Sequence, residues 1–317
     1  MSETVIETQG LVKYYGGRCI LNEINLKIPK GCIYGLLGRN GVGKTTLIRI
    51  LMGMETPTRG ATQLLGFDSM RLKSQVKGRI AYVAEGHHLI QGYRVNRLIR
   101  LCRSLARQWN QSFFDRLIEA FNLPMDRKIK ELSTGMRAQL NLALAMATDP
   151  EVLILDDPTL GLDTAARRQF LELAIDLIQR QGRTILFSSH ILADVERIAD
   201  RIGIIVAGDL VVDCSLAHLR ERIRKFRIVF ADQAPEQIPL TELVNFKRSG
   251  REILLTAANW SEQKQGMLEA LHPMEVTEIA MSLEDVFLEC SGAEPVTLTQ
   301  NEPIEEDHHA DLDTTRN

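Results

Sequence analysis

Short and long apolar segments alternate along the first two thirds of the chain. The short runs, such as 32–37 and 152–155, suit buried strands, whereas the longer segments repeat apolar residues every three or four positions, as helices do. This alternation is typical of an α/β protein with a mostly parallel sheet. The predicted strands are residues 4–14, 19–28, 32–37, 79–83, 152–156, 183–188, 202–206 and 209–213.

The pattern changes twice along the chain. Residues of about 88–149 read as helix after helix, which predicts an α-helical subdomain within a main domain of 1–225. Residues 226–290 contain the strand candidates RIVFA, REILLTA and MEVTEIA around a polar helix, and predict a small C-terminal α+β domain. From 291 to 317 the chain is acidic and lacks apolar periodicity, so this tail is predicted to be disordered.

The composition is that of an ordinary globular protein, with 44% hydrophobic and 25% charged residues and a formal net charge of −3. No apolar run approaches the roughly 18 to 20 residues of a membrane helix, and the N-terminus lacks a signal pattern, so we expect a cytoplasmic protein. Neither the net charge nor the spacing of aromatic residues favours nucleic-acid binding. The five cysteines form no CxxC pair, which argues against disulfides and zinc.

The sequence GRNGVGKTT at 38–46 fits the pattern G-x-x-x-x-G-K-[ST] and lies between a predicted strand and a helix. A phosphate chain needs several backbone N–H groups converging on its oxygens, so Gly38, Gly41 and Gly43 are expected to curve the loop. The helix that follows adds the positive end of its dipole. A glycine-rich turn with an incidental Lys-Thr is the less favoured reading.

Two side chains of this loop carry the expected chemistry. Lys44 reaches the β- and γ-phosphates of ATP, and the Thr45 hydroxyl binds Mg²⁺. Asn40 and Thr46 complete the nucleotide-binding residues of the loop. The expected cofactors are therefore ATP and Mg²⁺.

A second acidic element, LILDDP, is a buried strand that ends in Asp156 and Asp157. In an α/β sheet such a strand end lies beside the phosphate loop, which places Asp156 in the Mg²⁺ shell. Asp157 can then orient or deprotonate the attacking water. An Asp-Asp-Pro turn that merely caps the next helix is the alternative, and the phosphate loop makes it less favoured.

These motifs resemble those of an ABC-family ATPase over about the first 225 residues. LSTGM at 132–136 is similar to the family signature LSGGQ, with Ser133 and Gly135 matching and two other positions departing from it. Tyr15, in KYYGG, is similar to the aromatic residue that stacks on adenine, and Tyr14 is its possible substitute.

Two later positions continue the resemblance. Asp163, in Gly161-Leu162-Asp163, is similar to the aspartate of the family's D-loop, and His190 to its switch histidine, which contacts the γ-phosphate. A lone histidine after a strand is more often a capping or solvated residue. Its place in the ordered series favours the catalytic reading.

Two departures from the family pattern bear on the chemistry. Asp157 stands where the family usually has Glu, which withdraws the carboxylate by about 1.5 Å. A misplacement of about 1 Å can cost on the order of 10²-fold in rate, so slow hydrolysis is expected. Glu85 stands where the family usually has Gln, close to Mg²⁺ and the γ-phosphate. Its negative charge favours ATP if it binds the metal, and opposes ATP if it lies farther away.

The resemblance implies a P-loop NTPase core with a mostly parallel sheet, an antiparallel β part and an α-helical subdomain. It also implies an ATPase subunit that powers a separate transmembrane permease and works as a head-to-tail homodimer or heterodimer, held at the inner face of the membrane. The closing SLEDVFLECSG resembles that of small exporters. A nucleotide-gated regulatory module with little hydrolysis is the main alternative. A soluble ABC protein is less favoured, because repair members carry long coiled-coil insertions and translation members usually carry two cassettes, whereas only one P-loop is present here.

Arginines recur every three or four residues on one face of a predicted helix after the Glu85 segment. They are Arg94, Arg97, Arg100, Arg103 and Arg107. Val95, Leu98, Leu101, Cys102 and Leu105 are expected on the opposite, buried face. This arginine face is either an ordinary solvated surface or a dock for an acidic partner or lipid head groups.

Overall fold

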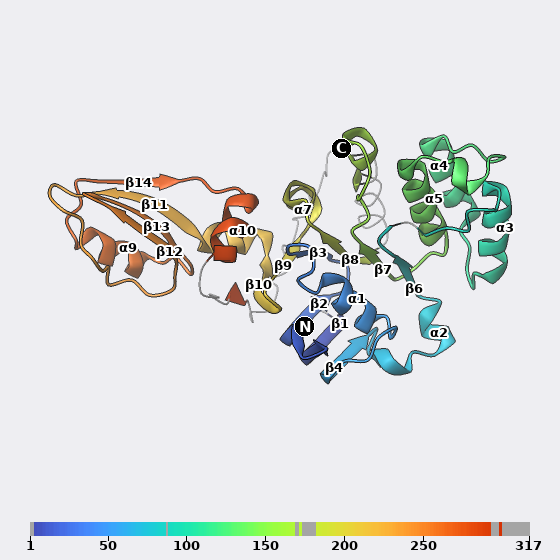
Figure 1. Ribbon diagram of the computed structural model, residues 1–317, viewed down its shortest axis with the longest axis horizontal. Coiled ribbons are helices and arrows are strands. Elements are labelled where there is room, and N and C mark those ends of the chain that lie inside the picture. The colour runs from blue at the N-terminus through green and yellow to red at the C-terminus, as the bar shows by residue number, and fades with distance from the viewer. Residues whose placement is uncertain (1–2, 87, 169–170, 173–181, 293–297, 300–317) are drawn as a thin grey trace, which may run out of the picture.

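A computed structural model describes residues 3–86, 88–168, 171–172, 182–292 and 298–299. Figure 1 shows an elongated molecule with a mixed α/β body at one end and a smaller sheet, formed late in the chain, at the other. The body contains a central sheet, an antiparallel sheet on one side and a group of helices beyond its far edge (Figure 1). This architecture agrees with the predicted P-loop type of fold.

The central sheet has the strand order β15-β10-β9-β3-β8-β7-β6. Its strands are β3 (Ile33–Leu37), β6 (Ile80–Val83), β7 (Val152–Asp156), β8 (Thr184–Ser189), β9 (Arg201–Val206), β10 (Asp209–Ser215) and β15 (Leu298–Thr299). The strands from β9 to β6 pair in parallel, and β10 pairs antiparallel with β9. Since the carboxyl ends of parallel strands share one edge, the loops after β3, β6, β7 and β8 meet there.

Strand β3 is buried throughout and contributes to two apolar cores, one on each face of the sheet. Ile33 and Leu37 belong to the core shared with the helical part, whereas Tyr34 and Leu36 belong to the core shared with the antiparallel sheet. Side chains alternate between the faces of a strand, so a run without polar residues is what a strand covered on both sides requires.

The antiparallel sheet has the order β2-β1-β4-β5. It consists of β1 (Thr4–Tyr15), β2 (Arg18–Pro29), β4 (Arg59–Leu64) and β5 (Phe67–Asp68). Helix α1 (Lys44–Leu51) contributes Leu47, Ile48, Ile50 and Leu51 to the core beneath this sheet. The phosphate-loop helix is thereby fixed between the two sheets.

The helical part contains α3 (Val95–Leu105), α4 (Gln111–Phe121) and α5 (Thr134–Ala147), and it covers the far side of β6 in Figure 1. Of the short elements, η1 (Ser69–Arg71) and α2 (Ser74–Lys77) lie between β5 and β6, and η2 (Ile129–Glu131) lies between α4 and α5. Apolar side chains of α3, α4 and α5 join the core on the Leu37 side of the sheet. This packing fixes the N-terminus of α5, where the LSTGM sequence lies.

The C-terminal sheet has the order β12-β13-β11-β14, and every pairing in it is antiparallel. The elements of this half of the chain are α7 (Leu192–Ile198), α8 (Leu216–Arg222), β11 (Arg224–Val229), β12 (Leu243–Ser249), β13 (Glu252–Ala257), α9 (Glu262–Glu269), β14 (Glu275–Ile279) and α10 (Leu283–Gly292). Phe226, Ile228, Ile253, Leu255 and Leu268 form its own apolar core. Helix α10 packs back against α7 and β9.

Several features differ from the sequence-based expectation. Strands β4, β5 and β12 were not predicted, because LVNFKRS and RGATQL lack a clean alternation of apolar and polar residues. In the tail predicted to be disordered, α10 continues through Gly292 and β15 pairs with β10, while the rest lies outside the described residues. None of the helices in the described part of the chain is both long enough and apolar enough to span a bilayer.

Candidate functional site

The phosphate loop connects β3 to α1 at the carboxyl edge of the central sheet. Gly41 and Gly43 have φ values of +80° and +114°, which favour glycine. A Cβ atom at Gly43 would also lie 2.7 Å from Leu21 Cδ2. Gly38 has no such φ, so its predicted part in curving the loop stays a prediction. Gly38 is a close-contact position, because a Cβ there would lie 2.8 Å from the carbonyl oxygen of Ile205.

Lys44 begins α1 and is buried inside the loop, with 7% of the residue exposed. Its ammonium group donates to the carbonyl oxygens of Gly38 (2.7 Å) and of the next residue (3.2 Å). Burial lowers the pKa of Lys44, and the nearby carboxylates of Asp157, Asp156 and Glu85 oppose that shift. The cation therefore sits in a strongly acidic surrounding, with its donors turned toward the loop.

Asp156 ends β7 and is almost completely buried. Its Oδ1 accepts hydrogen bonds from Ser188 Oγ (2.8 Å) and from Thr45 Oγ1 (3.1 Å). Its Oδ2 is buried and has no hydrogen-bond partner among the described residues. An orphaned carboxylate oxygen next to a threonine hydroxyl suits Mg²⁺, which commonly takes one or two protein oxygens together with phosphate oxygens and water. The residues present fit this metal.

Asp157 follows in a left-handed backbone conformation, with φ of +44°. Its N–H donates to Ser188 Oγ (2.9 Å), and its Oδ2 lies 2.6 Å from His190 Nδ1. Its Oδ1 is buried without a hydrogen-bond partner in the described part of the chain. One oxygen of the carboxylate therefore contacts the histidine, and the other can accept a proton or a hydrogen bond.

Ser188 was not predicted as a site residue, yet its hydroxyl contacts both aspartates. It lies on β8, the strand next to β7, and is fully buried. The only sequence signal for it was its place in the run ILFSSH, directly before Ser189 and His190. The hydroxyl thereby links the Asp156 carboxylate to the backbone N–H of Asp157.

Tyr15 ends β1 near the phosphate loop, and 44% of the residue is exposed. Its hydroxyl is hydrogen-bonded to Glu55 and interacts with Thr46 on α1. The Lys13 ammonium group lies 4.9 Å from the centroid of the ring. These contacts orient an exposed aromatic face at the entrance to the loop, where a base can stack. Tyr14 is similarly exposed, and Asn40 lies exposed in the loop itself.

Glu85 follows β6 and is exposed, without a hydrogen bond to another described residue. Its charge nevertheless acts on Lys44 and on Tyr82, in which burial is the first cause of a raised pKa. The structure thus brings Glu85 into the electrostatic surroundings of the loop but assigns it no contact. Its predicted role at the metal stays a prediction.

Three other predicted residues lie apart from the phosphate loop of their own chain. Ser133 caps α5 by accepting from Met136 N (3.1 Å), and both Ser133 and the nearby Gly135 are at least partly exposed. Asp163 accepts from Ala166 N (2.8 Å) as a local cap. Among the described residues, no hydrogen bond joins these three positions to the loop. Their predicted part in nucleotide binding stays a prediction.

A phosphate loop, two aspartates at a strand end and a histidine in contact with the second of them, on a sheet of this order, define a nucleotide-binding cassette. The family model described as ABC transporter matches residues 21–160, and the chain belongs to the ABC transporter family as an ATP-binding protein. It is 30% identical over 286 residues to the ABC transporter ATP-binding protein YtrB of Bacillus subtilis, covering 90% of this chain and 97% of the relative. The family is one of ATPases that bind ATP, typically with Mg²⁺.

Other relatives are similar over nearly their whole length. The bacitracin transport ATP-binding protein BcrA of Bacillus licheniformis is 32% identical over 91% of this chain and 98% of its own. The Nod factor export ATP-binding protein I of Rhizobium leguminosarum bv. viciae is 33% identical over 93% and 97%. Among solved structures, an ATP-binding subunit of an ABC transporter is 27% identical with a TM-score of 0.62, covering 69% of this chain and 92% of its own.

Proposed function

We propose that this chain hydrolyses ATP as the motor subunit of a membrane exporter, acting through an ATP-dependent head-to-tail dimer. The observation that carries the proposal is the cluster of Lys44, Thr45, Asp156, Asp157 and His190. It leaves two buried carboxylate oxygens without a hydrogen-bond partner among the described residues. The exporter part is supported by relatives of full-length similarity whose names describe bacitracin transport and Nod factor export.

The chemistry follows from the contacts of the two aspartates. When bound, Mg²⁺ would be held by Thr45 and Asp156 and would neutralise charge on the phosphates. Lys44 exchanges its loop carbonyl partners for phosphate oxygens. The free oxygen of Asp157 orients the attacking water and accepts its proton. His190 holds the other oxygen through Nδ1, which leaves Nε2 to meet the γ-phosphate.

The dimer explains the site residues that lie away from the loop. Ser133 and Gly135 are accessible at the N-terminus of α5, a helix of 14 residues whose positive end suits an anion. In a head-to-tail pair these residues would face the nucleotide bound to Lys44 and Thr45 of the other chain. Asp163 would lie between the two sites. ATP would then hold the two chains together, and the charge repulsion of the products would release them.

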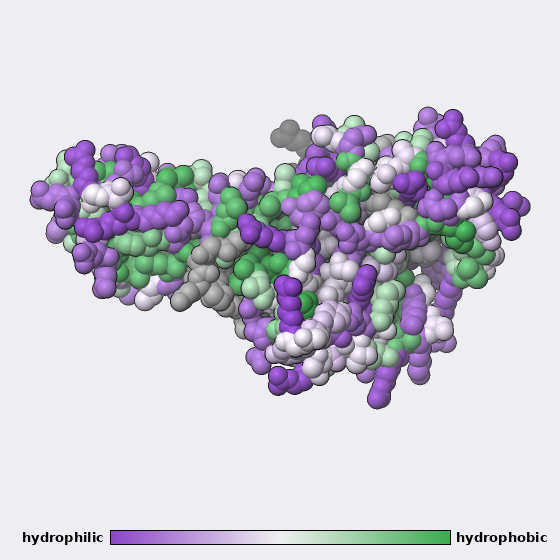
Figure 2. Space-filling model, in the orientation of Figure 1, coloured by the Kyte–Doolittle hydropathy of each residue, from purple (hydrophilic) through white to green (hydrophobic). Residues whose placement is uncertain are grey.

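We further propose that the chain is held at the cytoplasmic face of the membrane by its permease, and that the arginine face contributes to this contact. Helix α3 begins at Val95 and ends at Leu105, so Arg94 directly precedes the helix and Arg107 lies beyond its end. All five arginines are exposed, and none lies within 4.0 Å of a described carboxylate. Figure 2 shows hydrophilic side chains along the outer edge of this end of the molecule.

The contacts of the arginine face divide it into fixed and free parts. Arg94 donates to the carbonyl oxygen of Asp126, Arg107 donates to that of Gln75 (3.3 Å), and Arg97 stacks 4.3 Å from the centroid of Tyr93. Arg100 donates to the carbonyl oxygen of Asn96 in its own helix (3.4 Å), whereas Arg103 makes no hydrogen bond to another described residue. The opposite face is buried as predicted at Val95 and Leu98. The prediction that Leu105 is buried was wrong, because this residue lies at the helix end and is 77% exposed.

The experiment that tests the proposal is purification of the tagged chain from detergent-solubilised membranes of its own host. We expect a co-purifying membrane protein with about six apolar segments of roughly 20 residues each. We also expect Mg²⁺-dependent phosphate release that rises when this protein is reconstituted with the chain. ATP turnover that is the same with and without the membrane protein would contradict the proposed coupling.

One second function is favoured by a specific observation. Asp157 and Glu85 both depart from the family pattern at the positions closest to the reaction. If they abolish hydrolysis, ATP acts as a ligand that gates assembly, and the chain is a regulatory module. Single-turnover measurements on the ATP-bound protein distinguish the two functions, because the regulatory module retains ATP and releases no phosphate.

A further inference from the structure

Asp194 is a buried carboxylate on α7, with 7% of the residue exposed, four positions after His190. Its Oδ2 accepts a hydrogen bond from Thr159 Oγ1 (3.2 Å) and lies 3.8 Å from Arg167 Nε. A buried charge is costly unless it is paired and hydrogen-bonded. Both partners come from the segment that follows Asp157, so this carboxylate joins that segment to the switch helix.

The segment after Asp157 is a tight turn held by its own backbone. Leu160 N donates to Asp157 O (3.2 Å), and Leu162 N donates to Thr159 O (3.1 Å). Thr159 is 2% exposed, so its hydroxyl has Asp194 as its partner in the interior. Asp157 is therefore joined to this turn by a backbone hydrogen bond, and the turn is joined to α7 by Thr159.

The far end of the turn packs against the signature sequence. A Cβ atom at Gly161 would lie 2.8 Å from Thr134 Cγ2, and one at Gly135 would lie 3.6 Å from Leu162 Cδ2. The turn is thus in van der Waals contact with the start of α5. It lies between the Asp157–His190 pair and the exposed signature residues of the same chain.

We infer that Asp194 and Thr159 are positioning residues that couple the nucleotide site of a chain to the signature face it presents to its partner. The inference rests on the proposed dimer. His190 and Asp157 move together because they are in contact, and Asp194 ties the helix that follows the histidine to the turn that follows the aspartate. When His190 and Asp157 move in response to the γ-phosphate, α7 and the turn after Asp157 then move together, and this shift displaces the signature residues at the start of α5.

The test compares Thr159→Val, which removes the hydroxyl, with Thr159→Ser, which keeps it. Phosphate release is measured against ATP concentration in the full-length protein. For the wild type we expect a Hill coefficient approaching about 2, the number of sites in a dimer, and for Thr159→Val about 1. Thr159→Ser should restore the wild-type value. Affinity for fluorescently labelled ADP should stay within about twofold in all three proteins, because the phosphate loop is untouched.

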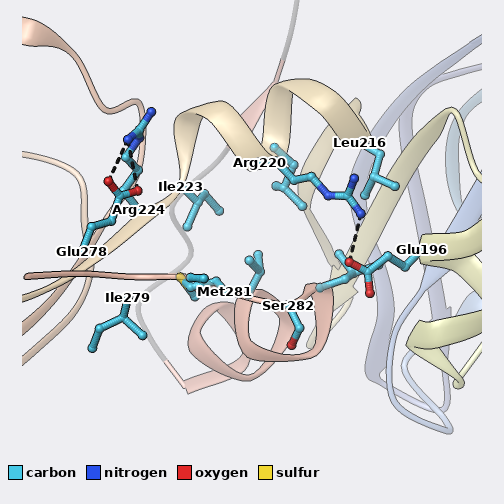
Figure 3. Close-up of a pocket in the computed structure, with 13 residues that line it drawn as sticks. Glu196, Leu216, Arg220, Ile223, Arg224, Glu278, Ile279, Met281 and Ser282 are labelled. Atoms are coloured by element: carbon cyan, nitrogen blue, oxygen red, sulfur yellow. Dashed lines mark hydrogen bonds and ion pairs between the residues drawn. The ribbon is translucent and has the colours of Figure 1, made fainter.

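Asp194→Ala is the second variant, alone and combined with Thr159→Val. If the two residues act through one bond, the double variant loses no more cooperativity than either single variant. The matched control is Glu196→Gln on the same helix, whose partner is Arg220 at 3.0 Å and which lines the groove between α7, α8 and α10 (Figure 3). It should keep the wild-type Hill coefficient.

Melting temperatures separate coupling from folding, because a merely structural role lowers stability without changing the Hill coefficient. If the wild type is cooperative and Thr159→Val is equally cooperative, this inference is overturned but the proposed dimer is not. A loss in Thr159→Ser as large as in Thr159→Val also overturns it, since the hydroxyl is then not responsible. A wild-type Hill coefficient of 1 overturns both this inference and the proposed dimer mechanism.

Discussion

Replacing Asp157 by Glu tests whether the reach of this carboxylate limits ATP turnover. The added methylene moves the carboxylate outward by about 1.5 Å, a C–C bond length. If the free oxygen of Asp157 in the wild type is too far from the water, Asp157→Glu can raise the rate by up to about 10²-fold. This corresponds to about 2.7 kcal/mol of activation free energy. The longer side chain also changes the 2.6 Å contact between the carboxylate and His190 Nδ1, so the glutamate and the histidine must adopt a new arrangement.

The backbone opposes part of this gain. Asp157 has φ of +44°, and a left-handed conformation costs roughly 1 to 2 kcal/mol for residues that lack the short polar side chain of Asn or Asp. Asp157→Glu should therefore turn over faster while melting at a lower temperature. Asp157→Asn keeps the size and the backbone preference but removes the proton acceptor, so it should bind ATP and release no phosphate.

The assay is steady-state phosphate release at saturating Mg²⁺-ATP, normalised to the fraction of protein that binds nucleotide. Thermal unfolding is recorded for the same three proteins. The reasoning is refuted if neither substitution changes the rate. Asp157 would then not handle the water, and pairing with a second subunit that carries a competent site would be the better account.

Three further predictions concern other parts of the account. Lys44→Ala should abolish productive ATP binding, because it removes the charge that faces the phosphates. Unchanged ATP affinity in equilibrium binding, together with unchanged phosphate release, would contradict the site assignment. Glu85→Gln should weaken the dependence of turnover on Mg²⁺ if the carboxylate contacts the metal, and identical Mg²⁺ titrations would place it in solvent. Charge reversal of Arg97, Arg100 and Arg103 should leave folding and basal turnover nearly intact but weaken membrane attachment, most visibly at low salt; full retention at two ionic strengths would make the face an ordinary solvated surface.

Much of the fold was readable from the sequence because its strongest signals are local. The strands of the parallel sheet are continuous apolar runs, and the predicted 152–156 and 32–37 agree with the observed strands within a residue. The phosphate loop is likewise a continuous motif whose glycines are demanded by backbone geometry at Gly41 and Gly43. Such local patterns predict the fold well, because a strand that is covered on both faces needs apolar side chains along its whole length.

The features that were missed depend on contacts between distant segments. Ser188 joins two aspartates of a neighbouring strand, and Asp194 bonds to Thr159 across 35 positions. Neither residue belongs to a pattern with a fixed spacing, so no periodicity marks it. Strand β12 carries polar residues on its exposed end, which hides its alternation. Leu105 was placed on a buried face because helical spacing alone does not show where the helix ends.

The central claim is that two chains complete one another's nucleotide site, and sedimentation of the Asp157→Asn protein with Mg²⁺-ATP tests it most directly. The account predicts a species of twice the chain mass that forms only with ATP. It also predicts that adding Ser133→Arg to this protein leaves a monomer that still binds ATP. A dimer that forms equally well with the Ser133→Arg change, or an Asp157→Asn protein that binds ATP and remains monomeric, would contradict the account.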